Sequence, residues 1–349
     1  MFLEGIKANY KFFLLAFLIT AILTPIAVKL MPKWGYLDIP KDNRRMHKVA
    51  MPVAGGVAMF IAFLITMPLA IKMDREFLCL LIGSAIIVVS GLIDDKIGLS
   101  PKMKILFQIA ASVALIVGGV KIRFFTNPWL GDELIWLNYL SVPITIFWIV
   151  GITNTVNLID GLDGLAAGVS MICALSLMFI AYKFGSTSQA LVAAIIAGAC
   201  LGFLPFNFHP AKIFMGDTGA LFLGFVLSYI SIGGFMKSAT ILTIFVPVLI
   251  LGVPVFDTAF AMVRRKMSGH SMVEADKGHL HHRLLRMGLS QRQTVLILYS
   301  ISIIFGISAY IIADIDPRRG FVLSILIIAA IVLVAGASGM FKSVRGEKK

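Results

Sequence analysis

Residues 138–182 read NYLSVPITIFWIVGITNTVNLIDGLDGLAAGVSMICALSLMFIAY, and two long apolar runs in them flank a short polar segment. A membrane-spanning helix needs about 20 mainly apolar residues, so the runs predict spans over residues 138–156 and 164–182. An ionised carboxylate in the bilayer core costs several kcal/mol, which places the polar segment outside that core. The segment carries polar residues at every third position: Asn154, Asn157, Asp160 and Asp163.

The rest of the chain is as apolar as this stretch. Of its 349 residues, 59% are hydrophobic and 14% are charged, whereas soluble globular domains are about 45–50% apolar and about 25% charged. The composition therefore predicts an all-α, polytopic integral membrane protein. No polar block is long enough for a separate soluble domain, so we expect a single membrane-embedded domain over residues 1–349. All three cysteines lie in apolar runs, which excludes a disulfide framework and a C-x-x-C metal site.

The same length criterion predicts about eleven transmembrane helices. The expected spans are residues 12–31, 53–71, 77–93, 104–120, 138–156, 164–182, 188–206, 218–236, 239–261, 294–313 and 320–340. Most of the polar chain then falls into short loops on alternating sides. The exceptions are a long loop over residues 264–293 and a tail over residues 341–349, both on one side.

Lys and Arg are divided unevenly between the two sides that these spans define. Twenty of the 31 lie on one side, ten lie on the other, and Lys29 lies within the first span. Cytoplasmic loops are enriched in Lys and Arg, so we expect the richer side in the cytoplasm, with the N-terminus outside and the C-terminus inside. The net charge of +13 does not indicate nucleic acid, because the basic residues punctuate apolar segments without forming an aromatic-interleaved patch.

Polar clusters gather on this predicted cytoplasmic side. They are GLIDDKIGLSPKMK (91–104), NTVNLIDGLDG (154–164), FNFHPAKIFMGDTG (206–219) and RRKMSGHSMVEADKGHLHHRLL (264–285), with RRMHKVAMPVAGG (44–56) before the second span. Transporters place ionisable groups near the bilayer midplane within broken helices. The crowding at one face favours an enzyme with its site there, and a transporter is the alternative of another class.

Asp94 and Asp95 end the third apolar run. Consecutive residues on a helix point about 100° apart, so the two carboxylates need not serve the same partner. They are either a pair at the end of a span, neutralised by Lys96, or a general base or metal-associated acid that faces Lys102 and Lys104. Two neighbouring carboxylates with different proton affinities suit proton transfer.

The spacing of the four polar residues in the opening stretch limits how they can act together. Each step of three residues falls about 60° short of a full helical turn, so Asn154 and Asp163 would point in nearly opposite directions. One shared site would require a break in the helix, for which Gly161 and Gly164 are suited. We expect neighbouring members to work in pairs, and one of the four to be an N-cap or turn residue.

Asp217 in MGDTG (215–219) directly precedes the span expected over residues 218–236, where an aspartate is either an N-cap residue or a ligand. Together with the amide oxygen of Asn157 it would offer the hard oxygen ligands that Mg²⁺ prefers. For HLHH (279–282) we identify no carboxylate or thiolate that would complete a tetrahedral site, which disfavours zinc, and the arginines around it favour a phosphate or pyrophosphate. The residues thus indicate a membrane-face enzyme that acts on a phosphate ester with Mg²⁺.

The chain resembles the polyprenyl-phosphate N-acetylhexosamine-1-phosphate transferases in four motifs and in their order. They are the aspartate pair of residues 91–104, the N-x-x-N-x-x-D-G-x-D-G-L-A-x-G pattern, MGDTG and HLHHRLLRMGLS. The resemblance covers nearly the whole chain. One subfamily transfers phospho-MurNAc-pentapeptide and carries P-x-H-H-H-F in its last cytoplasmic loop. The other initiates teichoic acid, O-antigen or enterobacterial common antigen and carries H-x-H-H. HLHHRLL is similar to the second, with Arg283 where some members have a third consecutive histidine.

The resemblance also implies residue roles. Asn157 and Asp217 would hold Mg²⁺, or Mn²⁺ in its place, against the UDP pyrophosphate. Asp94 would deprotonate or orient the lipid phosphate with Asp95 beside it, and Asp160 would lie nearest the reaction.

The remaining implied roles concern substrate binding. Lys104 would bind a substrate phosphate and Asp163 would contact the nucleotide. The diphosphate or sugar would be clamped by Arg265, His279, His281 and His282. For Arg45 and His47 the resemblance implies only proximity to the site.

The implied reaction joins UDP-GlcNAc and polyprenyl (undecaprenyl) phosphate to give polyprenyl-diphospho-GlcNAc and UMP at the cytoplasmic face of the bacterial inner membrane. Direct attack by the lipid phosphate is favoured over a covalent aspartyl intermediate, because phosphoryl transfer needs mainly positioning and charge neutralisation. UDP-MurNAc-pentapeptide is the alternative donor. A homodimer is expected from the resemblance alone.

Overall fold

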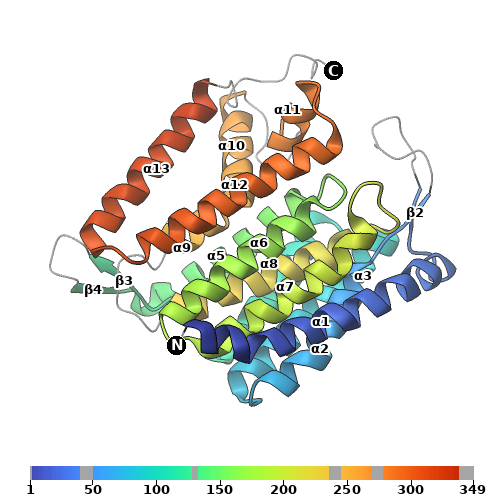
Figure 1. The fold of residues 1–349 in the computed structure, drawn as a ribbon, viewed down its shortest axis with the longest axis horizontal. Helices are drawn as coiled ribbons and strands as arrows, with labels where there is room; N and C mark the ends of the chain where they lie inside the picture. Colours follow the sequence, from blue (N-terminus) through green and yellow to red (C-terminus); the bar gives the residue numbers. More distant parts are fainter. Residues whose placement is uncertain (1, 40–49, 128–132, 236–244, 269–277, 338–349) are drawn as a thin grey trace.

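The computed structural model describes residues 2–39, 50–127, 133–235, 245–268 and 278–337 (Figure 1). Helices dominate these residues: α1 Phe2–Leu30, α2 Gly56–Ala70, α3 Arg75–Ile97, α4 Pro101–Val117, α5 Ser141–Leu158, α6 Leu165–Lys183, α7 Thr187–Asn207, α8 Gly216–Phe235, α9 Phe245–Ile250, α10 Gly252–Met267, α11 Leu280–Arg286, α12 Gln291–Ile312 and α13 Pro317–Ala337. Within the described ranges, eight helices are long and apolar enough to cross a membrane. The predicted all-α, polytopic membrane class is confirmed.

Ten of the eleven expected spans coincide with one helix each, from α1 to α8 and at α12 and α13. The expected span over residues 239–261 is wrong as a single helix: its described part consists of α9 and α10, which meet at Leu251. Apolar composition alone does not reveal such a break. The exact number of spans and the sides of the termini stay predictions, and the tail over residues 341–349 lies outside the described residues.

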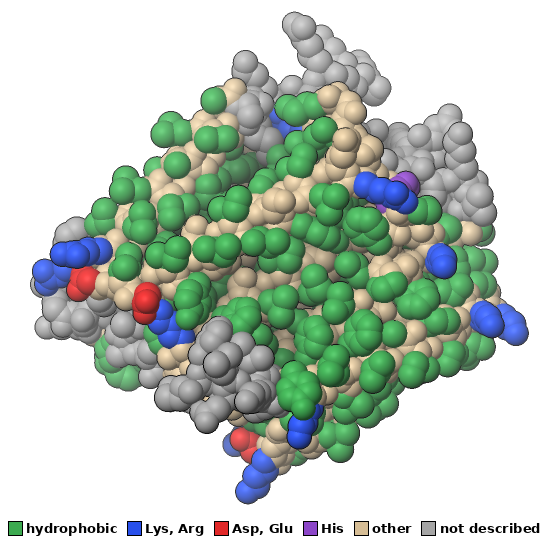
Figure 2. All heavy atoms as spheres, in the orientation of Figure 1, with side chains coloured by type: hydrophobic (Ala, Val, Ile, Leu, Met, Phe, Trp, Pro, Cys, Tyr) green, Lys and Arg blue, Asp and Glu red, His purple; other side chains and the backbone are tan. Residues whose placement is uncertain are grey.

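The centre of the bundle is formed by α6, α7 and α8. The apolar windows of these three helices are 72%, 72% and 83% buried, whereas the windows of α1 and α13 are 22% and 17% buried. The outer helices α1, α3 and α5 pack directly on α7 or α8. Figure 2 shows the consequence on one face, where hydrophobic side chains cover the helices and the charged side chains lie mostly toward the ends. Such a surface suits lipid.

Two glycines let α1 approach α7 closely. A Cβ atom on Gly198 would overlap the carbonyl oxygen of Phe13, and one on Gly202 would overlap that of Phe17. Glycines four residues apart lie on one face of a helix, and in membranes such small residues allow two helix backbones to meet. Gly198 and Gly202 therefore let α1, whose apolar window is 22% buried, pack closely on the buried helix α7.

Two short hairpins depart from the all-helical expectation. β1 (Leu37–Asp38) pairs with β2 (Met51–Pro52), and β3 (Phe124–Asn127) pairs with β4 (Glu133–Trp136). Both hairpins lie in loops between helices, and each strand has at most four residues. The β1–β2 hairpin lies beside the end of the bundle at which the polar motifs meet (Figure 1).

We expect Gly198→Ala to lower the stability of the detergent-solubilised protein by about 1–3 kcal/mol, the usual effect of overpacking. Gly151→Ala in α5 is the matched control, because a Cβ atom there has nothing within 4 Å, and alanine favours a helix over glycine. The measurement is the midpoint of thermal unfolding. Equal midpoints for the two variants would contradict the close α1–α7 contact.

Candidate active site

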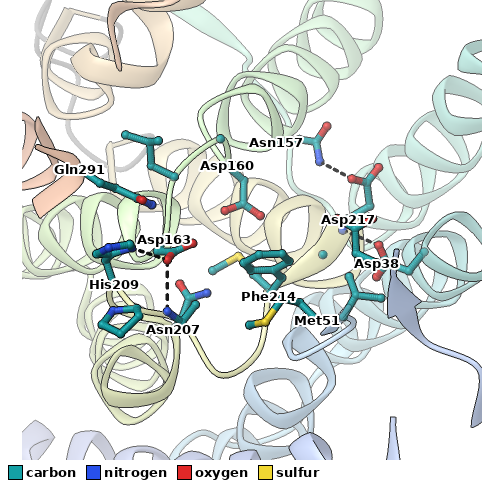
Figure 3. A pocket seen from close by; sticks show the side chains of 18 of the residues that line it. Asp38, Met51, Asn157, Asp160, Asp163, Asn207, His209, Phe214, Asp217 and Gln291 are labelled. Carbon is teal, nitrogen blue, oxygen red and sulfur yellow. Dashed lines mark hydrogen bonds and ion pairs between the residues drawn. The ribbon is translucent and has the colours of Figure 1, made fainter. Parts of the chain in front are cut away.

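The polar motifs meet in one cavity of about 720 Å³ at one end of the bundle. Its walls come from the last turns of α3, α5 and α7, the first turn of α8, the turn before α6 and the β1–β2 hairpin. Figure 3 shows Asp160 between two groups of side chains, one around Asn157 and Asp217 and the other around Asp163 and His209. Sequence motifs separated by more than a hundred residues therefore share one site.

Asp95 anchors the start of α8 to the end of α3. Its Oδ1 accepts a hydrogen bond from the backbone N–H of Asp217 at 2.8 Å, and its Oδ2 accepts from the N–H and the hydroxyl of Thr218 at 3.2 and 2.6 Å. These backbone N–H groups are donors that a helix leaves unpaired at its N-terminus. The geometry supports a positioning task for Asp95, and its catalytic role stays a prediction.

Asp217 lies at the centre of an ionic cluster. Its Oδ2 is 2.6 Å from Lys104 Nζ, its Oδ1 accepts a hydrogen bond from Asn157 Nδ2 at 3.0 Å, and the same lysine nitrogen is 2.8 Å from Asp94 Oδ2. The alternative that Asp217 caps its own helix does not fit, because Asp95 supplies the cap. Lys104 thus joins Asp94, which the sequence had placed near it, to Asp217, which is 113 residues away in the chain.

Among the described residues, one group of three acidic side chains could hold a metal ion. Ligand atoms of Asp94, Asp95 and Asp217 all lie within 4.8 Å of one another. The amide of Asn157 adjoins Asp217, and a 180° rotation of this amide would present its oxygen to an ion. The donor set consists of hard oxygens, which fits a cation such as Mg²⁺.

The polar turn between α5 and α6 separates the four residues of the opening stretch. The helix ends at Leu158, earlier than Gly161, and the next begins at Leu165 after Gly164 with φ +79°. Asn154 remains within α5 and exchanges hydrogen bonds with Gln108 at 2.6 and 3.2 Å. It does not line the cavity, whereas Asn157, Asp160 and Asp163 do; the tasks of the four residues stay predictions.

Asp160 faces the middle of the cavity from this turn (Figure 3). Burial is the main cause that raises the pKa of Asp160 to about 7, and the negative charges of Asp217, Asp95 and Asp163 add to it. A carboxyl group with this pKa changes its protonation state near neutral pH, which suits a group close to proton or phosphoryl transfer.

Asp163 is held at the far side of the cavity by a histidine that the sequence interpretation had missed. His209 Nδ1 donates a hydrogen bond to Asp163 Oδ2 at 2.8 Å, and the backbone N–H of Ala211 donates to the same oxygen at 3.1 Å. Arg292 Nε in turn donates to the His209 carbonyl at 3.1 Å. The available signal was the position of His209 inside the FNFHPAKIFMGDTG cluster, eight residues before Asp217.

The histidines of HLHH occupy three different places. His282 lines the cavity, whereas His279 and His281 are 5% and 3% exposed and do not. His279 Nδ1 lies 2.8 Å from Asp257 Oδ2. Asp257 precedes His279 by 22 residues, so the sequence did not indicate this pairing. Burial lowers the pKa of His281 to about 3, with a smaller effect of His282, so its ring is neutral at physiological pH.

Some predicted residues lie outside the cavity as described. Arg265 is on the last turn of α10 and is not among the lining residues. Arg45, His47 and part of the loop over residues 264–293 lie outside the described residues. Conversely, the cavity walls include residues for which the sequence interpretation had proposed no role: Asp38, Met51, Asn207, Phe214 and Gln291.

Comparison with known proteins identifies relatives over most of the chain. The model of glycosyl transferase family 4 matches residues 77–235. A Bacillus subtilis protein named "Probable undecaprenyl-phosphate N-acetylglucosaminyl 1-phosphate transferase" is 40% identical over 94% of this chain and 91% of its own length.

Two further relatives extend the comparison. A Mycolicibacterium smegmatis decaprenyl-phosphate N-acetylglucosaminephosphotransferase is 35% identical over 92% of this chain and 86% of its own. A Staphylococcus saprophyticus phospho-N-acetylmuramoyl-pentapeptide-transferase is 33% identical over 85% of this chain and 97% of its own. The resemblance inferred from the motifs is confirmed.

The raised pKa of Asp160 predicts a pH-dependent stability. The folded state holds the proton more tightly than the unfolded state, whose carboxyl titrates near 3.8, so stability decreases as pH rises from about 4 toward 7. We expect Asp160→Asn, which stays neutral, to unfold at an increasingly higher temperature than the original protein as pH rises from 5 to 8 in buffer without divalent cations. A difference in unfolding temperature that does not change with pH would contradict this.

Proposed function

This chain belongs to glycosyl transferase family 4, among the polyprenyl-phosphate N-acetylhexosamine-1-phosphate transferases, and we propose that it transfers GlcNAc-1-phosphate from UDP-GlcNAc to undecaprenyl phosphate. The products are undecaprenyl-diphospho-GlcNAc and UMP. The observation that carries the proposal is the convergence of Asp94, Lys104, Asn157 and Asp217 from four helices at one end of an apolar bundle. An enzyme that joins a water-soluble donor to a lipid acceptor needs its polar site at such an end.

The acidic cluster supports a divalent cation, for which we propose Mg²⁺. Asn157 and Asp217 would hold it, and Asp94 lies on the other side of Lys104 Nζ. When bound, Mg²⁺ would neutralise the donor diphosphate and the charge that develops during transfer. The carboxylates alone would repel that diphosphate, so the cation and Lys104 together make the site attractive to it.

The protein's own residues position the two phosphates. Lys104 has its charge between two carboxylates and is suited to bind a phosphate oxygen of either substrate. We propose that an oxygen of the lipid phosphate, oriented by Asp94, attacks the β-phosphorus of UDP-GlcNAc. The bond between that phosphorus and the bridging oxygen breaks, and UMP leaves with the bridging oxygen. The nucleophile is already anionic, so the step requires no covalent aspartyl intermediate.

The opposite side of the cavity would receive the rest of the donor. Asp163 is fixed by His209 and Ala211 through its Oδ2, which leaves Oδ1 available to accept a hydrogen bond from the nucleoside. His282 also lines the cavity and would contact the diphosphate or the sugar. Asp160 lies between the two ends (Figure 3), close to where the transferred phosphoryl group would pass.

The proposed location is the bacterial inner membrane, with the cavity facing the cytoplasm. The excess of Lys and Arg on that side supports this orientation, and both the soluble donor and the phosphate of an inner-leaflet lipid would reach it. The product would be the first lipid-linked intermediate of an envelope polysaccharide, such as teichoic acid or lipopolysaccharide. A homodimer is part of the proposal only through the family resemblance.

The experiment that tests the proposed function is a donor panel. Purified protein in detergent is given undecaprenyl phosphate, Mg²⁺ and either UDP-GlcNAc or UDP-MurNAc-pentapeptide, and UMP is measured. We expect UMP with UDP-GlcNAc and little with the pentapeptide donor.

Three results would change this account. Turnover of the pentapeptide donor alone would replace the donor assignment. Transport of UDP-GlcNAc into vesicles without UMP formation would replace the enzyme with a transporter. A burst of UMP in the absence of lipid acceptor would replace direct attack with a covalent intermediate.

The proposed cation site predicts the behaviour of two variants. Asp217→Asn and Asn157→Ala should each lower kcat about 100-fold or more at limiting Mg²⁺, because removing a preorganised charge-stabilising group commonly has an effect of this size. Raising the Mg²⁺ concentration should restore Asn157→Ala more than Asp217→Asn. Asn154→Ala is the matched control, because Asn154 contacts Gln108 outside the cavity. Near-normal activity of both variants at limiting Mg²⁺ would remove these residues from the site.

A further inference from the structure

Asp257 is a buried carboxylate that the proposed reaction does not use directly. It lies in α10, is 4% exposed and does not line the cavity. Burial of a carboxylate is unfavourable unless the group is fully paired, so its partners indicate why it is there. Asp257 falls within the span expected over residues 239–261, where a lone acidic residue is itself a sign of function.

Both oxygens of Asp257 hold the start of the HLHH segment. Oδ2 is 2.8 Å from His279 Nδ1, and Oδ1 accepts a hydrogen bond from the backbone N–H of Leu280 at 2.7 Å. An ionised carboxylate can only accept hydrogen bonds, so His279 carries its proton on Nδ1. One carboxylate therefore fixes the ring orientation of His279 and the first backbone N–H of α11.

The His279 ring is the first of three neighbouring histidine rings that reach the polar turn between α5 and α6. The His279 and His281 rings are nearly parallel, with centroids 5.8 Å apart, and the His281 and His282 centroids are 4.2 Å apart. On its other side His281 abuts Gly161, where a Cβ atom would lie 2.5 Å from His281 Nε2. The histidine segment is thus confined between α10 and the turn that carries Asp160 and Asp163.

We infer that Asp257 is a positioning residue for the nucleotide-sugar donor. It acts through His279 and His281 to place His282 at the cavity wall, where His282 would contact the diphosphate or sugar of the donor. The inference rests on the proposed function and extends it. It predicts that Asp257, a residue outside the cavity, affects the binding of the donor but not the binding of the lipid acceptor. Neighbours that orient a contacting side chain commonly change binding or activity about 10–100-fold when removed.

The test is Asp257→Asn, which keeps the size of the side chain but leaves a single accepting oxygen for two donors. We expect the KM for UDP-GlcNAc to rise about 10–100-fold, while the KM for undecaprenyl phosphate stays within about twofold of the original. Without the lipid acceptor, protection of the protein against thermal unfolding by UDP-GlcNAc and Mg²⁺ should require a correspondingly higher UDP-GlcNAc concentration. The matched control is Thr258→Val, because the buried Thr258 hydroxyl has no hydrogen-bond partner among the described residues, and neither KM should change.

Gly161→Ala is a second variant that leaves the Asp257–His279 pair intact and displaces His281 from the other side. It should raise the donor KM in the same selective way, which keeps the inference testable if Asp257→Asn does not fold. An unchanged donor KM in a folded Asp257→Asn protein would overturn the inference. So would an equal rise in both KM values, or, if Asp257→Asn does not fold, an unchanged donor KM in Gly161→Ala. Failure of the original protein to release UMP would instead overturn the proposed function.

Discussion

The contact between the end of α3 and the start of α8 is the constraint on which the site depends. Asp95 accepts three hydrogen bonds from Asp217 and Thr218, and the adjoining glycines make room for it. A Cβ atom on Gly91 would overlap the backbone of Thr218, and one on Gly216, which has φ +71°, would overlap the Asp95 carboxylate. The carboxylate of Asp217 is thereby fixed beside Asp94, although 123 positions separate Asp94 and Asp217 in the chain.

This arrangement also explains how an apolar chain tolerates so many acidic groups together. The carboxylates lie at helix ends, where the α8 N-terminus supplies unpaired N–H donors and a positive dipole. Lys104 bridges two of them. The remaining negative charge would attract a divalent cation, and with the cation bound the site would attract a diphosphate. Stability of the site and affinity for its substrate thus have the same electrostatic origin.

Much of this could be predicted from the sequence, because apolar length identifies spans and an ordered set of motifs identifies the family. Ten of the expected spans coincide with single uninterrupted helices. The break between α9 and α10 was not predicted, since the residues immediately on either side of Leu251 are apolar. The motifs also identified which residues carry charge near the site, but not which of their atoms are already engaged. Asp95 and His279 resemble ligands in sequence and are hydrogen-bonded to protein groups in the structure. The partners Asp257 and His209 became apparent only through folding.

The central proposal is that the α3–α8 contact fixes Asp217 where, together with Asn157, it would hold a divalent cation. It is tested most directly by equilibrium binding of Mn²⁺ to the purified protein, followed by electron paramagnetic resonance in the presence of UMP. The account predicts one saturable Mn²⁺ per chain that Mg²⁺ displaces and that Asp217→Asn abolishes. The absence of saturable binding, or binding that Asp217→Asn leaves unchanged, would contradict it.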